Sequence, residues 1–191
     1  MSESLEDRIA ISDLMIGWIH RDLAQWDNLR QLFHDDGVIE VTWFEGRFDD
    51  FVDASMRMGA SSFKNKHVIT SPVITFNGGK AIAETNAMIV GENIDLGIGC
   101  VNHNRFYDRI EKRQGVWKIV NRQSIYDMGS FTFPSGNRDI DPEVVNRYPR
   151  EYAPLGYVLE KSGFPVRRVF ATKGSDLEKS MKAEGMEWLA A

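Results

Sequence analysis

Two long β-rich segments, residues 98–112 and 116–131, constrain the fold of this chain more than any other feature of its sequence. The loop Arg113-Gln114-Gly115 separates them, and short loops that contain a glycine join the two strands of a hairpin. Both segments are much longer than the usual strand of about 5–6 residues. Long strands twist, so a sheet built on this pair has to curl. We therefore expect a strongly curved, mostly antiparallel sheet.

Further segments provide partners for this hairpin. Residues 67–76 and 81–91 are β-rich and flank the sequence Asn-Gly-Gly-Lys at 77–80, which is a strong turn signal. Residues 38–44 alternate with a period of two, which predicts a strand that ends at the Glu-Gly pair 45–46.

Helical spacing of apolar residues precedes most of the strands. It predicts a first helix over about 4–20, with Ser4 in a capping position. A second short helix is expected over 26–33, ending in the polar turn 34–37, whose glycine would cap it. A third covers about 48–56. Early helices and late strands indicate an α+β fold with the helices on one face of the sheet.

The end of the chain has a different character. Residues 132–147 form a polar linker marked by proline, and two amphipathic helices are expected beyond it, around 152–159 and 177–188. This part is too short for a separate core. We therefore predict a core domain over 1–131 and an extension over 132–191 that packs on the core or on a neighbouring subunit.

Composition excludes several classes of protein. The 23 basic and 28 acidic residues give a net charge of −5, so nucleic acid is not an expected partner. Cys100 is the single cysteine, which rules out an intramolecular disulfide and favours a reducing compartment. The first residues are acidic and polar, and no apolar run approaches a membrane span. A cytoplasmic location without membrane contact is the expectation.

The four histidines are the natural candidates for proton transfer near neutral pH. His34 lies in the polar turn and is expected at the surface, and His20 ends the first helix, where solvent or the helix dipole accounts for it. His67 is different, because a carboxylate at the corner between two helices, Asp22, lies where it can reach the sheet. Two alternatives stay open: His67 as a core residue, and Asp22 as the N-cap of a helix that starts near Ala24.

The strand around His103 is unusually polar on both faces. By alternation His103 shares one face with Tyr107, whereas Asn104 shares the other with Cys100 and Phe106. One of these faces should line a pocket or an interface.

Familiar catalytic motifs are missing from the sequence. It contains no His-x₃-His or HExxH pair for a metal and no G-x-S-x-G elbow for a nucleophilic serine. It also lacks the glycine-rich loops that hold nucleotide phosphates. We therefore expect no metal and no cofactor.

Four local motifs together resemble one known group. They are I-x-D-L at 11–14, D-x₃-WDNLRQLFHDDG at 22–37, K-H-x-I at 66–69 and GVWKI at 115–119. Over about residues 4–130 the chain resembles the SnoaL-like branch of the nuclear-transport-factor-2-like superfamily, which includes scytalone dehydratase, bile-acid 7α-dehydratase and γ-hexachlorocyclohexane dehydrochlorinase. The resemblance implies a cone-shaped α+β barrel, three N-terminal helices over the concave face of the sheet, and commonly a homodimer or homotrimer built through the sheet.

The resemblance also implies the site residues. The catalytic histidine of the family matches His67, its aspartate partner matches Asp22, and an arginine that lines the site in dehydrochlorinase-like members matches Arg122. One departure stands out, because relatives carry Lys or Tyr five positions before the aspartate and this chain has Gly17. Residues that would supply the missing contact are His20, His103, Tyr107 and Tyr126.

These residues predict a cofactor-independent lyase, of the dehydratase kind, or an isomerase that acts on a small cyclic hydrophobic molecule. Asp22 would orient His67 as the base, and Arg122 or Asn104 would stabilise negative charge. The alternative is a non-catalytic ligand-binding or assembly module, and a hydrolase with an Asp-Arg-Asp arrangement is a third possibility. The residues expected to bind the substrate are Trp18, Trp26, Trp43, Phe44, His103, Asn104, Phe106 and Tyr126.

Overall fold

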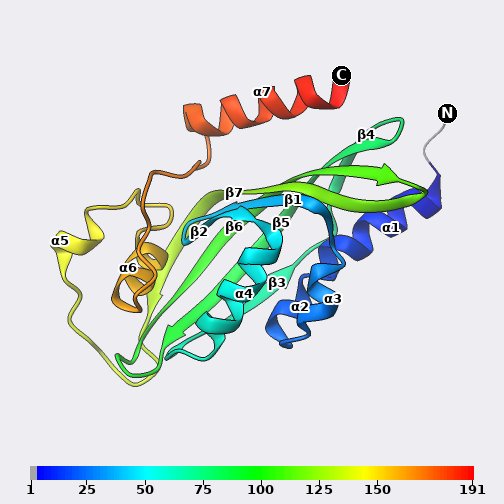
Figure 1. Cartoon of the computed structure of the whole chain (residues 1–191). Helices are drawn as coiled ribbons and strands as arrows, with labels where there is room; N and C mark the ends of the chain where they lie inside the picture. Colours follow the sequence, from blue (N-terminus) through cyan, green and yellow to red (C-terminus); the bar gives the residue numbers. More distant parts are fainter. Residues whose placement is uncertain (1–3) are drawn as a thin grey trace.

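A curled seven-stranded sheet organises the chain, as the computed structural model shows for residues 4–191 (Figure 1). The strand order is β2-β1-β7-β6-β5-β3, and β4 also pairs with β5. The strands are β1 Phe33–Val41, β2 Phe44–Arg47, β3 Phe63–Ile69, β4 Val73–Asn77, β5 Lys80–Asn93, β6 Ile98–Arg113 and β7 Val116–Thr132. The helices are α1 Leu5–Ile16, α2 Ile19–Asp22, α3 Trp26–Arg30, α4 Phe48–Gly59, α5 Pro142–Val145, α6 Ala153–Lys161 and α7 Asp176–Ala190. The predicted α+β class is confirmed.

The long hairpin predicted from the sequence is the centre of this sheet. Strands β6 and β7 are 16 and 17 residues long and run antiparallel, as does β5 against β6. Among the strand pairs formed by residues 4–191, β1 and β7 are the parallel pair. The sheet is therefore mostly antiparallel, as expected.

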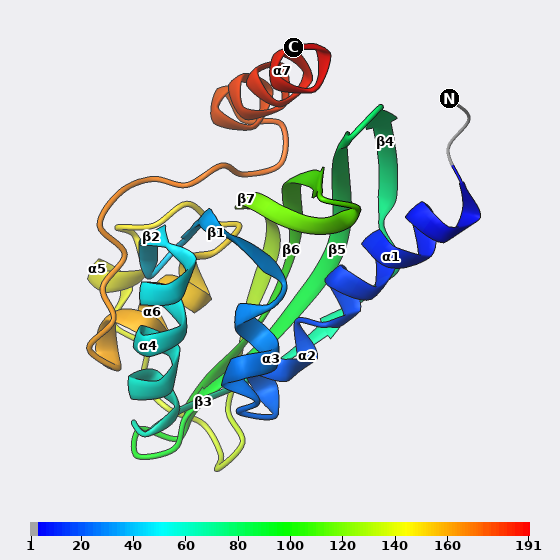
Figure 2. The same cartoon turned by 45° about the vertical axis from the view of Figure 1, so that its right-hand side comes forward.

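Helices cover both faces of the sheet, but for different purposes (Figures 1 and 2). Helices α1 and α4 pack on the inner face, where Met15 and Phe51 join Phe106 in one core. Helix α7 lies on the opposite, outer face, where Leu189 packs with Ile82. The inner face and its helices therefore enclose the space in which a small-molecule site can lie.

The first predicted helix is shorter than expected. Ser4 caps α1 as predicted, since its hydroxyl accepts a hydrogen bond from the Asp7 amide at 3.0 Å. The helix ends at Ile16, and α2 then begins at Ile19. A Cβ on the intervening Gly17 would lie 2.6 Å from a terminal methyl group of Leu32, so a larger residue here would have to displace the Leu32 side chain.

The polar segment 34–37, predicted as a turn, lies instead within β1. It still leaves the regular ladder, because Phe33 pairs with Ile119 and the next pair is Val38 with Asn121. Five steps along β1 thus oppose two along β7, and the polar residues form a bulge. The second short helix accordingly ends at Arg30 and is not capped by a glycine.

The predicted strand over 67–76 is two strands, β3 and β4, which both pair with β5. They are separated at 70–72, where Pro72 has no amide hydrogen for the ladder. A short strand, β2, was not predicted at all. It pairs with β1 through residues 44–47.

The two helices expected in the extension are present as α6 and α7, and the linker also contains α5. Tyr152, Leu155 and Leu159 are buried against residues of the sheet such as Tyr126. Within the described residues the extension therefore packs on the core. Residues 1–3 of the predicted core domain 1–131 lie outside the described residues.

Candidate active site

An apolar space lies between the inner face of the sheet, α2, α4 and α6, and we call it the inner cavity. Its free volume is about 30 Å³, which is room for roughly one water molecule. A ring-sized ligand therefore requires its walls to move. The residues that line it are Trp18, Arg21, Val41, Thr42, Trp43, Phe51, Phe63, Asn65, His67, Ile89, Phe106, Ser124, Tyr126, Leu155 and Leu159.

His67 and Asp22 form a buried pair at one wall of the inner cavity. The ring Nδ1 of His67 lies 2.7 Å from Asp22 Oδ1, and the His67 amide donates to Asp22 Oδ2 at 2.6 Å. Their side chains are only 6% and 7% exposed. With Nδ1–H donated to the carboxylate, Nε2 is the nitrogen left to accept a proton. Nε2 has no partner among residues 4–191.

The fold places both members of the pair. His67 stands opposite Ile89 in the β3–β5 ladder, which directs it to the inner face with Phe106. Asp22 ends α2, and Ala24 then turns the chain into α3 with a φ of 53°. Gln25 occupies the N-cap of α3, so the alternative that Asp22 caps this helix is wrong.

Burial and charge determine the protonation of the pair. Burial lowers the pKa of His67, and the positive charges of Arg21 and Arg122 lower it further, against the opposing effect of Asp22. Burial would raise the pKa of Asp22, but hydrogen bonds from the ring and amide of His67, together with the positive charge of Arg21, bring that pKa below the usual value. The resulting form is an ionised Asp22 beside a neutral His67 at neutral pH.

Arg122 lies behind the cavity wall. Its Nε and Nη2 each lie 2.8 Å from an oxygen of Asp108, and both side chains are fully buried. The guanidinium carbon is 4.6 Å from the Trp18 ring and 4.2 Å from the Phe106 ring, the two rings that face the cavity. Its Nη1 has no partner in the described part of the chain. The positive charge of Arg122 is thus separated from the cavity by the rings of Trp18 and Phe106.

Four of the eight expected substrate-binding residues line the inner cavity: Trp18, Trp43, Phe106 and Tyr126. Asn104 pairs with Ala87 and Tyr126 on the same face of the sheet, and both atoms of its buried amide are unpartnered within residues 4–191. Of the two polar faces expected for the strand around His103, the one that carries Asn104 is therefore directed to the inner side of the sheet.

The other three expected binding residues lie elsewhere. Phe44 packs against Phe51 behind the wall. Trp26 lines a neighbouring hollow, and His103 is exposed on the outer face of β6.

Of the residues considered to replace the polar side chain missing at Gly17, only Tyr126 faces the inner cavity. Its hydroxyl donates to Thr42 Oγ1 at 3.3 Å and accepts from the Thr42 amide at 3.1 Å. His20 is half-buried and its ring contacts Gln25, and Tyr107 packs under α7 on the outer face.

Sequence reasoning missed Arg21 and Asn65 as cavity residues. A signal for each was present, because Arg21 is three positions after Trp18 on a helical turn and Asn65 is two before His67 on a strand. No such signal exists for Leu155 and Leu159, which α6 brings from the extension.

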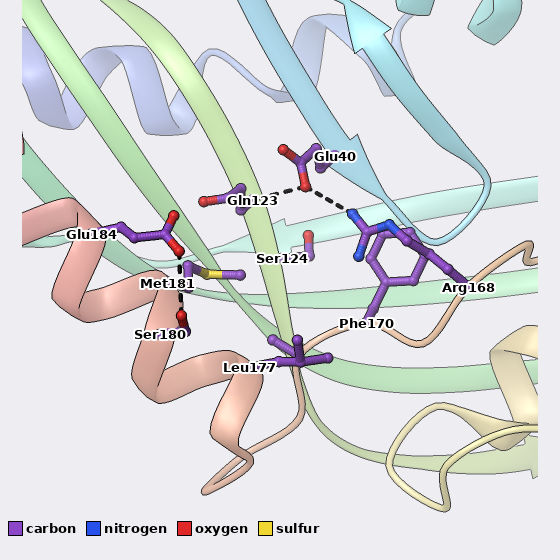
Figure 3. Close-up of a pocket in the computed structure, with 10 residues that line it drawn as sticks. Glu40, Gln123, Ser124, Arg168, Phe170, Leu177, Ser180, Met181 and Glu184 are labelled. Carbon is purple, nitrogen blue, oxygen red and sulfur yellow. Dashed lines mark hydrogen bonds and ion pairs between the residues drawn. The ribbon is translucent and has the colours of Figure 1, made fainter.

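Two further hollows border this region. The outer hollow, about 200 Å³, shares Arg21, Phe63 and Asn65 with the inner cavity and is also lined by Asp22. A second, of about 140 Å³, lies between α7 and β7 and is crossed by the Arg168 to Glu40 ion pair (Figure 3). It contains neither His67 nor Asp22.

Within residues 4–191 no group of three His, Cys, Asp or Glu side chains is placed to hold a metal ion. No helix in this range is both long and apolar enough to cross a membrane.

The curled sheet and its inner-face helices form the curled α+β fold that the sequence predicts, and the His67–Asp22 pair lies inside it. The SnoaL-like domain matches residues 3–123, more than half of the chain, so the chain belongs to this family.

Individual relatives are more distant. Pea pathogenicity protein 2 of Fusarium vanettenii is 28% identical over 168 residues, which cover 81% of this chain and 70% of that protein. A protein from Novosphingobium aromaticivorans, provisionally named a scytalone dehydratase, has a TM-score of 0.57 at 18% identity, covering 71% of this chain and 97% of that one. A type 2 hexachlorocyclohexane dehydrochlorinase, LinA, has a TM-score of 0.56 at 19% identity, with 72% and 95% covered. At these identities the solved structures support the fold.

Proposed function

We propose that this chain is a cofactor-independent acid–base enzyme, a dehydratase-like lyase or an isomerase, for a small cyclic hydrophobic molecule. The observation that carries the proposal is the His67–Asp22 pair, joined at 2.7 Å at the wall of an apolar cavity. A base held in one tautomer beside an apolar surface is suited to removing a proton from a carbon next to a carbonyl group.

In the proposed reaction Nε2 of His67 takes that proton, and Asp22 stabilises the imidazolium that forms. The electrons of the broken C–H bond move to the carbonyl oxygen as an enolate. In a dehydration they then expel the hydroxyl group from the adjacent carbon, and the proton on His67 leaves with it as water. In an isomerisation His67 returns the proton to a different carbon. Atoms and charge balance in both cases without a cofactor.

The negative charge that develops needs donors in a site with little water. Asn104 offers an unpartnered amide on the inner face, and Arg122 offers an unpartnered Nη1 behind Trp18 and Phe106. We assign hydrogen-bond donation to the enolate to Asn104, whereas Arg122 contributes only its positive charge, which acts across the rings of Trp18 and Phe106. Relatives carry Lys or Tyr at the position of Gly17, and Tyr126 offers a comparable hydroxyl group to the cavity. Burial raises the pKa of Tyr126, so this hydroxyl remains a hydrogen-bond donor at neutral pH.

Two of the structurally similar proteins carry names that denote eliminations, a dehydratase and a dehydrochlorinase. Both reactions begin with the loss of a proton and end with the loss of a leaving group. This supports the reaction class and leaves the substrate open.

The experiment is a turnover screen with cyclic hydroxy ketones and cyclic enones, followed by His67→Asn and Asp22→Asn. We expect losses of about 10²–10⁴-fold in kcat for His67→Asn, the usual contribution of a positioned base. His103→Asn is the matched control, because that ring is exposed on the outer face. Full turnover by the folded His67→Asn variant would refute the assignment.

A second function, a ligand-binding module without catalysis, is favoured by the small free volume of the inner cavity, about 30 Å³, and by Gly17. It predicts that cyclic ligands bind to the wild type and to His67→Asn with equal affinity and that no compound in the screen is converted.

A further inference from the structure

Arg21 is a buried cation that forms no ion pair with a carboxylate of residues 4–191. Its side chain lies at the wall of the inner cavity, and the residue is 7% exposed. Its Nη1 donates to Asn65 Oδ1 at 2.7 Å and its Nη2 to Met58 Sδ at 3.4 Å, whereas Nε has no partner among residues 4–191. An amide oxygen and a thioether, both uncharged, are the acceptors that the described residues offer it.

Asp22, the adjacent carboxylate in sequence, forms no ion pair with Arg21. Both of its oxygens accept hydrogen bonds from His67, and its negative charge acts on Arg21 only through space. The remaining neighbours are aromatic: the guanidinium carbon is 5.9 Å from the Trp43 ring and 5.8 Å from the Phe51 ring. Burial accordingly lowers the pKa of Arg21 to about 10, which still leaves it charged at neutral pH.

Such a residue is costly to the fold. Taking a charge out of water without an ion partner destabilises the folded state, and an apolar side chain of similar shape would serve packing better. Positions where a chain tolerates this cost are expected to be functional. Arginine in particular matches the two oxygens of a carboxylate with its planar fork of N–H donors.

The place of Arg21 fits a binding role. Arg21, Asn65 and Phe63 each line both the inner cavity and the outer hollow, so together they form the partition between the two spaces. A ligand that enters from the outer hollow meets the guanidinium before it reaches His67. If the ligand replaced Asn65 as the hydrogen-bond partner, the partition would open and the two spaces would join.

We propose that Arg21 binds a carboxylate on the ligand of the inner cavity, so that the ligand class is a cyclic, otherwise apolar carboxylic acid. This inference rests on the proposed function, because it adds a specificity-determining residue to the same site. The carboxylate pairs with the unpartnered cation, the rings of Trp43 and Phe51 cover the apolar body, and the remainder of the molecule extends toward His67.

The test is equilibrium binding by titration calorimetry with two matched pairs of probes, benzoate against benzamide and 2-naphthoate against 2-naphthamide. The wild type is expected to bind each carboxylate at least 10-fold more tightly than its amide. Arg21→Met should remove this preference, and Arg21→Lys should retain part of it. Lys66→Gln, which removes an exposed cation from the opposite face of β3, should leave it unchanged.

Thermal unfolding separates the binding role from a structural one. Arg21→Met should melt at the same temperature as the wild type or higher, because it removes an unpaired buried charge. A lower Tm together with equal losses for carboxylate and amide would assign Arg21 to the fold and overturn the proposal. Equal binding of both members of a pair by the wild type, or no binding of any probe, would also overturn it.

The two proposals fail in different ways. If His67→Asn keeps full turnover but the carboxylate preference depends on Arg21, the catalytic assignment is wrong and the ligand class stands. If the preference is absent while His67→Asn loses turnover, the ligand class is wrong and the acid–base function stands.

Discussion

At the scale of single residues, the site depends on His67 being neutral while it is buried beside an ionised aspartate. Burial, Arg21 and Arg122 each lower the pKa of His67 from its ordinary value of 6.5, and Asp22 opposes them. A base with a lowered pKa is unprotonated over the whole neutral range. Arg21 and Arg122 thus help to keep His67 unprotonated through their charges, without a hydrogen bond to it.

This predicts the pH dependence of turnover. The rate should rise with pH through an apparent pKa below 6.5 and be flat from pH 7 upward. Arg21→Met removes a positive charge that lowers the pKa of His67, so its rising limb should move to higher pH. The pH profile of kcat/KM for both proteins measures this, and a limb that moves to lower pH would contradict it.

The same group affects stability. Because the folded pKa of His67 is below 6.5, the unfolded chain binds more protons in the window between the two values. The contribution of His67 to the free energy of unfolding is therefore complete above pH 6.5 and decreases as the pH falls toward the folded pKa. In His67→Asn this part of the pH dependence should be absent, as urea unfolding between pH 5 and 8 would show.

The contact between His67 and Asp22 was predictable because local motifs carry both residues. The partners of the pair were harder. Arg122 was placed on the correct strand, but the sequence does not reveal that Asp108 holds it or that Trp18 and Phe106 separate it from the cavity. Such contacts depend on the register of β6 and β7, which shifts twice along its length.

At the scale of elements, the two helices of the extension do different work. Leu155 and Leu159 of α6 line the inner cavity, whereas α7 packs on the outer face through Leu189. Arg105 on the outer face reinforces α7 by ion pairs with Glu84, Asp127 and Glu178. We propose that α6 is part of the site and that α7 serves stability alone.

Matched leucine variants test this division. Leu159 and Leu189 are 1% and 4% exposed, so each change to alanine should lower the free energy of unfolding by about 2–5 kcal/mol. Only Leu159→Ala should also change the KM or the affinity for cyclic ligands. Urea unfolding and steady-state kinetics of both variants provide the measurements. A changed KM in Leu189→Ala, with KM intact in Leu159→Ala, would reverse the assignment.

The elements differ in how far the sequence determines them. The hairpin at 77–80 and the long strands were predictable from turn chemistry and alternation, which act locally. The bulge at 34–37 and the short strand β2 were not predictable. The bulge forms because β1 pairs with the distant strand β7, and β2 forms because it pairs with β1. The sequence of the polar, glycine-containing segment 34–37 is typical of a turn, and its place in a strand depends on the pairing of β1 with β7.

At the scale of the whole molecule, α7 leaves part of the outer face uncovered. Five apolar residues on β3, β5, β6 and β7 form what we call the outer patch: Val68, Met88, Val90, Val101 and Met128. Val68 pairs with Met88 and Val90 with Val101, whereas His103 lies between Met88 and Met128. Val68, Val90 and Met128 are 47%, 40% and 62% exposed. Adjacent exposed apolar side chains on a sheet are typical of protein interfaces. The outer patch is therefore where the predicted homodimer or homotrimer would form through the sheet.

Met128→Arg tests this assembly. A charge within the outer patch should dissociate the oligomer, because burying an unpaired charge in an interface is strongly unfavourable. Light scattering should then give the mass of one chain. Turnover should persist, since Met128 faces away from the inner cavity. Met56→Arg is the matched control, an exposed methionine of α4 that is 44% exposed on the other side of the sheet, and it should keep the mass of the wild type. A wild type that is monomeric at every concentration, or dissociation by Met56→Arg and not by Met128→Arg, would remove the outer patch as the interface.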